Sequence, residues 1–193
     1  CQTAEGKKVA CDKPAEQVAK YPNAKRIEPE FPKSKIAKQW DAFAKTVTAA
    51  EPNAIITSAQ AIIASPEASN NEKSEAAYQA AIANLKIDNA NYVKPIEFSE
   101  LALKFNGLNN NQQYSLMLLL SQMQLAQKNY EQALTIVNQY AKETGIEDLA
   151  VEKVRGNSLY RLNRYAEAAP VLQKAYDLDK GADPNLGSML MDS

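Results

Sequence analysis

Residues 114–143 read YSLMLLLSQMQLAQKNYEQALTIVNQYAKE, and residues 149–178 read LAVEKVRGNSLYRLNRYAEAAPVLQKAYDL. With a shift of 35 residues, the second stretch can be laid over the first so that Tyr165 falls on Tyr130 and Ala168 on Ala133. Apolar residues recur at helical spacing in both stretches, and a short polar break divides each of them. A self-match at this period predicts helix-turn-helix units in tandem.

The pattern resembles the tetratricopeptide repeat family, whose period is about 34 residues. In that family a small residue of the first helix packs on a small residue of the second, and a bulky residue opens the second helix. Here the small pairs are Ser121 with Ala133 and Gly156 with Ala168. The resemblance implies an all-α fold, a right-handed superhelical solenoid of antiparallel helix pairs whose first helices line a concave groove.

The rest of the chain divides around these units. Residues 1–35 are rich in proline and lysine and predict an irregular N-terminal arm, followed by a helical domain at 36–193. Within that domain we expect a degenerate pair or cap at 36–66, repeats at 72–105, 112–143 and 147–179, and the start of a truncated further repeat at 184–193. Ser34 is expected to be the N-cap of the first helix in this domain, and Asn106-Gly107 is expected to end a helix in a left-handed conformation.

The apolar spacing also predicts which side chains are buried and which are not. The expected core positions are Leu120, Leu134, Val137, Leu159, Tyr165 and Leu172. The last helix has no partner after it, although the ends of a solenoid need a polar cap. We therefore expect apolar exposure and self-association through the truncated C-terminus, at Leu178, Leu186, Met189 and Leu190.

Composition excludes several classes of function. The net charge of −1 does not favour nucleic acid, because a duplex binder needs a concentrated basic face. The chain has no histidine and two cysteines, which leaves catalytic triads and the common zinc or iron–sulfur sites without their ligands. The longest apolar run, Leu116–Leu120, is far shorter than the roughly 20 residues of a membrane span. We expect no catalytic residue, cofactor or metal ion.

The N-terminal residue leaves three interpretations open, because it is Cys1 and not methionine. The N-terminus can be an arbitrary boundary. It can follow removal of an export signal, after which Cys1 and Cys11 would form a disulfide. It can also be the acylated cysteine of a bacterial lipoprotein, which would anchor Cys1 to lipid. Two of these interpretations predict a periplasmic or outer-membrane-associated protein, and a cytoplasmic location stays open.

The candidate binding surface follows from the repeat register. Eight residues before each tyrosine that opens a second helix stand Asn84, Gln122 and Asn157. A carboxamide can pair with a peptide backbone whatever the peptide sequence, or it can satisfy buried carbonyls within the repeats. By resemblance, the groove also includes Leu118, Leu125, Lys153, Tyr160 and Arg161. Lys153 and Asn157 resemble the K-x-x-x-N with which some repeats of the family bind a terminal carboxylate.

Three functions are consistent with the sequence. The leading hypothesis is a scaffold that binds a peptide or partner protein in the groove; for exported bacterial members, the resemblance implies outer-membrane assembly, secretion or TonB-linked transport. The first alternative is a structural spacer within a longer repeat protein. The second is a hydrolase that uses carboxylates alone, with candidate acids at Glu75, Asp88, Glu143 and Glu152.

Overall fold

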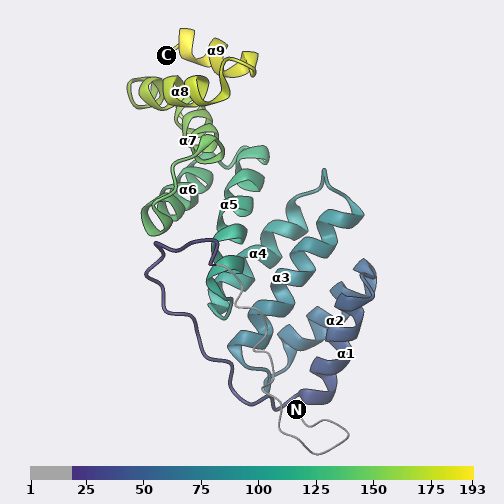
Figure 1. Cartoon of the computed structure of the whole chain (residues 1–193). Coiled ribbons are helices and arrows are strands. Elements are labelled where there is room, and N and C mark those ends of the chain that lie inside the picture. The colour runs from purple at the N-terminus through teal and green to yellow at the C-terminus, as the bar shows by residue number, and fades with distance from the viewer. Residues whose placement is uncertain (1–18) are drawn as a thin grey trace, which may run out of the picture.

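The computed structural model describes residues 19–193, and this part of the chain is all-helical, without a strand (Figure 1). The helices are α1 (Ala37–Thr48), α2 (Pro52–Ala64), α3 (Asn70–Ile87), α4 (Val93–Phe105), α5 (Asn110–Ala126), α6 (Tyr130–Thr144), α7 (Leu149–Arg161), α8 (Tyr165–Asp179) and α9 (Pro184–Met191). Each helix packs against the next one along the chain, which gives a repeat-like architecture. The all-α prediction is therefore confirmed, while Cys1 and Cys11 lie outside the described residues.

Capping residues explain where most helices begin and end. At α3, the hydroxyl of Ser69 accepts from the amide of Glu72, whose carboxylate accepts from the Ser69 amide in return. Asn109 and Asp148 cap α5 and α7 with one hydrogen bond each, in which a side-chain oxygen accepts from a backbone amide. Asn106, as expected, ends α4 with a left-handed φ of 53°.

One predicted helix start is wrong. We expected a Ser34 cap at the start of the 36–66 unit, but α1 begins at Ala37. The hydroxyl of Ser34 accepts from the amide of Ile36 and donates to the carboxylate of Glu72. Ser34 therefore attaches the arm to α3 rather than capping α1.

The core lies between paired helices. Five of the six expected core residues are buried, namely Leu120, Leu134, Val137, Leu159 and Leu172. The prediction that Tyr165 is buried is wrong, because this residue is 40% exposed. As the first residue of α8, it packs its ring edge-on against Tyr160 and donates its hydroxyl to Asn163 instead of entering the core.

Contacts between non-consecutive helices arrange the second half of the chain. Besides the consecutive pairs, α5 packs against α7, and α7 against α9. These three helices consequently share one side of the molecule. This side presents the surface described in the next subsection.

The C-terminal helix α9 differs from the sequence prediction. Leu186 and Met189, expected to be exposed, are 1% and 7% exposed because α9 packs onto α7 and α8. Leu178 is 48% exposed, as expected, and Leu190 is partly buried. The apolar surface that would drive self-association is thus smaller than the sequence predicted.

The described part of the arm, residues 19–35, lies along one edge of the helices (Figure 1). Tyr21 is 4% exposed and packs between Tyr114 of α5 and Tyr140 of α6. The carboxylate of Glu28 accepts from the amide of Asn110 at the start of α5. Across residues 19–193, no helix combines the length and hydropathy that a bilayer span requires.

Candidate functional site

Two adjoining hollows follow the side formed by α5, α7 and α9. The first, the α5–α7 hollow, has a volume of about 550 Å³ and is lined by Gln122, Leu125, Leu149, Ala150, Lys153, Val154 and Asn157. The second, the α7–α9 hollow, has a volume of about 410 Å³ and is lined by Asn157, Tyr160, Arg161, Asp183, Asn185, Ser188 and Met189. Asn157 lines both, so the two hollows form one continuous surface.

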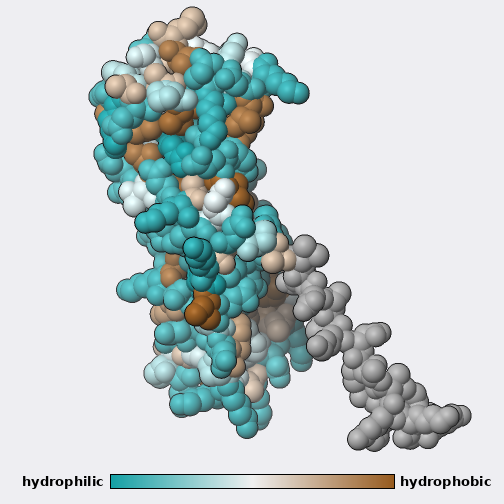
Figure 2. Space-filling view, turned by 60° about the vertical axis from the view of Figure 1, so that its left-hand side comes forward, coloured by the Kyte–Doolittle hydropathy of each residue, from teal (hydrophilic) through white to brown (hydrophobic). Residues whose placement is uncertain are grey.

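The two hollows differ in chemistry. Leucine, valine and alanine side chains form most of the α5–α7 hollow, while hydroxyl, amide and charged groups dominate the α7–α9 hollow. Apolar residues are visible on the surface at the height of α7 to α9, surrounded by hydrophilic ones (Figure 2). An apolar pocket next to a polar one is suited to a ligand that presents both kinds of group.

Lys153 is held at the boundary between the hollows by two carboxylates. Its ammonium donates to Asp183 at 3.0 Å and lies 3.6 Å from Asp179. The hydrogen bond to Asp183 is the main reason that the pKa of Lys153 is raised, and the same bond lowers the pKa of Asp183. Because both partners are anionic, the charge of Lys153 is already compensated, which weakens the case for a grip on a terminal carboxylate.

The three predicted amides occupy different environments. Asn157 Nδ2 donates to the carbonyl oxygen of Lys153 one turn earlier in its own helix, and Asn84 Nδ2 donates in the same way to Ala80. Gln122 is exposed, and its side-chain amide has no hydrogen-bond partner among the described residues. Asn84 lies on α3, outside both hollows, so the structure brings only Gln122 and Asn157 together.

The remaining groove candidates lie on α5 and α7. Leu125 lines the α5–α7 hollow, whereas Leu118 is partly buried against the core between α5, α6 and α7. Tyr160 and Arg161 line the α7–α9 hollow, where the Tyr160 hydroxyl donates to Asp192 and the Arg161 guanidinium lies over the Tyr160 ring. Six of the eight predicted groove residues therefore share this surface.

The candidate acids of the hydrolase hypothesis belong to separate networks. Glu152 is 1% exposed and accepts from Lys174 at 2.7 Å and from Arg155. Glu75 accepts from Gln79 and Gln112, and Glu143 accepts from Gln139. Asp88, just after α3, accepts from the amide of Ala90. Within residues 19–193, no group of three or more acidic, histidine or cysteine side chains is placed to hold a metal ion.

Comparisons with protein-family models, curated proteins and solved structures gave no match to this chain.

The repeat pattern did not indicate every residue of this surface. Leu149, Ala150 and Val154 line the α5–α7 hollow, and only Lys153 and Asn157 of the same helix had been predicted. Their spacing of about one helical turn from those two residues could have indicated them. Asn185 and Ser188 of α9 carried no such signal, because their position depends on how α9 folds back onto α7.

Proposed function

We propose that this protein is a non-catalytic interaction scaffold of tetratricopeptide-repeat type, in which stacked helix pairs form a right-handed superhelix. The 35-residue repeat and the packing of each helix on the next support this proposal. The observation that carries it is the continuous surface of two hollows on α5, α7 and α9, where six residues predicted as groove residues gather.

The geometry favours an internal segment of an extended peptide as the ligand. An apolar side chain of the peptide would fill the α5–α7 hollow, and the Gln122 and Asn157 amides at its rim would pair with the peptide main chain. Lys153 is neutralised by Asp179 and Asp183, so this lysine offers little to a terminal carboxylate. Recognition then depends on the apolar side chain and on main-chain hydrogen bonds.

The same proposal includes a location in the bacterial envelope and a role in outer-membrane assembly, secretion or TonB-linked transport. It rests on the resemblance to exported members of that family. Mass spectrometry of the native mature protein is the test. An acyl mass on Cys1 or a Cys1–Cys11 disulfide would support export, and two unmodified thiols would argue against it.

The scaffold proposal is tested with a peptide selected on the whole chain from a random peptide library. We expect Gln122→Ala and Asn157→Ala each to weaken binding by about 1 kcal/mol, which is the net value of a typical hydrogen bond. Leu125→Asp should weaken it by more, because it places a charge in the apolar hollow. Isothermal titration calorimetry measures the affinities, and circular dichroism checks that each variant is folded.

Asn84→Ala is the matched control. Asn84 and Asn157 make the same hydrogen bond to their own helix, but Asn84 lies outside both hollows. We expect Asn84→Ala to leave the affinity unchanged. Equal losses at Asn84 and Asn157, or full affinity after Leu125→Asp, would show that the peptide binds elsewhere.

A further inference from the structure

A larger cavity lies away from the groove, where the arm meets the ends of α5 and α6. Its volume is about 690 Å³, within the range of roughly 300–1,000 Å³ that is usual for small-molecule sites. It is lined by Asn23, Lys25, Arg26, Asn106, Gln113, Tyr114, Gln139, Lys142, Glu143 and Gly145. Four separate segments build it, namely the arm, the end of α4, the start of α5 and the end of α6.

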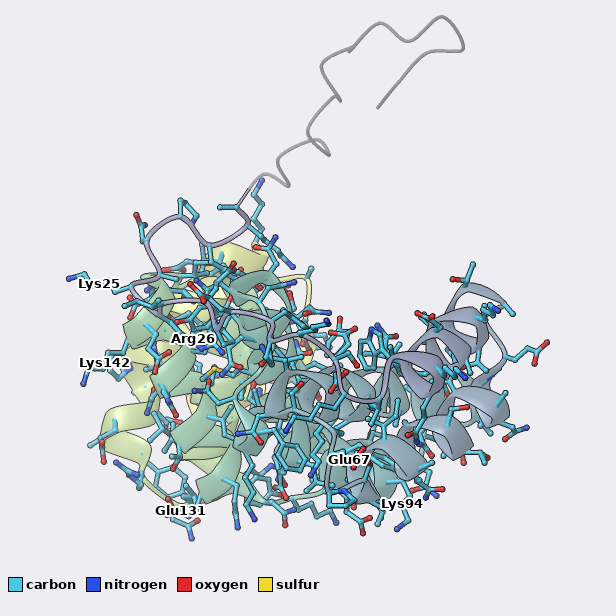
Figure 3. All side chains as sticks on the ribbon, turned by 90° about the horizontal axis from the view of Figure 1, so that it is seen from below. Lys25, Arg26, Glu67, Lys94, Glu131 and Lys142 are labelled. Carbon is cyan, nitrogen blue, oxygen red and sulfur yellow. The ribbon has the colours of Figure 1, made fainter. Side chains whose placement is uncertain are left out.

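The charges around this cavity are mainly positive. Figure 3 shows Lys25, Arg26 and Lys142 at the same end of the molecule, with Arg26 further inside than the two lysines. Neither Lys25 nor Lys142 is ion-paired with a carboxylate within residues 19–193. Glu143 is the one carboxylate in the cavity wall, and one of its oxygens accepts from Gln139.

Arg26 contributes charge to the cavity but has no donor to spare. Its guanidinium donates to the side chain and carbonyl of Asn106, to the carbonyl of Leu108 and to the side chain of Asn110. These acceptors are all neutral, so they satisfy the hydrogen bonds of Arg26 without compensating its charge. The positive potential of the cavity therefore stays available to a ligand.

Two buried polar atoms at the cavity have no partner among the described residues. They are the hydroxyl of Tyr114, a residue that is 0% exposed, and the side-chain oxygen of Gln113. The hydroxyl lies towards the cavity beside Glu143, whose carboxylate is the next cause, after burial, of the raised pKa of Tyr114, although it does not accept from the hydroxyl in good hydrogen-bond geometry. Burial is the main reason that this pKa rises to about 12, so the phenol is neutral at physiological pH. Buried polar groups are nearly always hydrogen-bonded in folded proteins, so both atoms are available to water or to a ligand in the cavity.

We propose that this cavity binds a small molecule of amino-acid type, with a carboxylate at one end and a hydrogen-bond donor, such as an ammonium group, at the other. The carboxylate is recognised by Lys25 and Lys142. The donor end is recognised by the side-chain oxygens of Gln113, Glu143 and Tyr114, the last two of which are neighbours.

The same wall disfavours other anions. Glu143 would repel a phosphate dianion, and Arg26 cannot form the paired hydrogen bonds that phosphate sites commonly use, because its donors are occupied. The cavity is independent of the groove, since none of its lining residues lines either hollow. A failure of one proposal would leave the other intact.

The test is a nitrogen-15 NMR titration of the whole chain with the twenty protein amino acids, one at a time, and with glycylglycine. We expect saturable shifts at the amides of Tyr114, Lys142 and Gly145 for at least one of these probes. Glycylglycinamide lacks the carboxylate and should bind at least tenfold more weakly than glycylglycine. Saturable shifts with inorganic phosphate but with none of the amino acids would overturn the ligand class, and no saturable shift with any probe would overturn the site.

Variants identify the groups that bind. Tyr114→Phe keeps the ring in the core and removes only the unpartnered hydroxyl, so it should weaken the best probe by about tenfold without lowering the melting temperature. Lys25→Gln combined with Lys142→Gln changes two exposed side chains and should also weaken it by about tenfold. Lys86→Gln, an exposed change on α3, is the control and should have no effect. Unchanged binding in both test variants would overturn the assignment.

Discussion

At the scale of single residues, a close backbone contact constrains Gly107, and the helical periodicity of the sequence does not indicate this contact. Asn106, not Gly107, adopts the left-handed conformation that ends α4. A side chain at Gly107 would instead meet the backbone of α3, with its Cβ 2.7 Å from the carbonyl oxygen of Asn70 and 2.8 Å from the amide nitrogen of Asn71. Ser74 and Asn71 also hydrogen-bond to the Gly107 backbone, so this close approach fixes the α4–α5 loop against α3.

Gly107→Ala is therefore expected to destabilise the protein by about 3 kcal/mol, the upper end of typical overpacking, because the clashing atoms belong to the backbone. Gly187→Ala is the control. Its nearest neighbour would be Tyr176 Cε2 at 3.4 Å, and alanine is favoured over glycine inside a helix by up to about 1 kcal/mol. Urea unfolding measures both changes. An equal, small effect of the two substitutions would contradict the close approach.

Single residues also mark the limit of prediction for the candidate site. The repeat register indicated Gln122, Leu125, Lys153 and Asn157, because it identifies which residues share a helix face. It could not indicate that Lys153 is paired with Asp179 and Asp183, since those carboxylates come from α8 and its connection to α9. The repeat pattern indicates the faces of single helices, but it does not contain the contacts between helices.

At the scale of elements, the helices with strong local signals were predictable and the ends of the chain were not. The spacing of apolar residues indicated the paired helices from α3 to α8, together with the stop at Asn106. The start of α1 and the docking of α9 depend on tertiary contacts, namely Ser34 with Glu72 and Leu186 with α7 and α8. Propensity gives way to such contacts most easily where a helix is short or terminal.

The start of α3 provides a prediction about pH. Burial by itself would raise the pKa of Glu72, but hydrogen bonds from Ser34 and from the amide and hydroxyl of Ser69 outweigh it, and the pKa lies below the ordinary 4.5. A lowered pKa in the folded state means that ionised Glu72 stabilises the protein above pH 4.5. This stabilisation is lost as the pH falls through the lower, folded-state value.

Glu72→Gln should accordingly cost about 2 kcal/mol at neutral pH, the typical value of hydrogen bonds to a charged group, and the cost should shrink as the solution is acidified below pH 4.5. Unfolding free energies of both proteins from neutral pH to about pH 3 give the difference curve, whose fall reports the Glu72 titration. Glu67→Gln, an exposed change outside this network, is the control and should change the stability at neutral pH by no more than about 0.5 kcal/mol. A difference that does not depend on pH would contradict the role of the charge.

At the scale of the whole molecule, the described chain divides into two parts that the arm connects. Helices α1 to α4 share one core with Leu108 and Leu116, and helices α5 to α9 surround two others. The α5–α7 and α7–α9 contacts have no equally extensive counterpart between α3 and α5 in the described residues. The arm runs along both parts, with Ser34 at α3, Arg26 at the α4–α5 loop and Tyr21 between α5 and α6 (Figure 1).

Tyr21→Ala should consequently destabilise the two parts unequally. The ring of Tyr21 lies 5.3 Å from that of Tyr114 and 6.0 Å from that of Tyr140, and its loss should cost about 3 kcal/mol, as for other large aromatic side chains in a core. Hydrogen exchange followed by mass spectrometry should show lost protection in α5 and α6 while α2 and α3 keep theirs. Tyr21→Phe retains the ring and loses only the hydrogen bond with Ser115, so its effect should be about 1 kcal/mol. If Tyr21→Ala lowered protection equally in all helices, the chain would unfold as one unit, and the arm would stabilise the whole molecule rather than the α5–α6 pair.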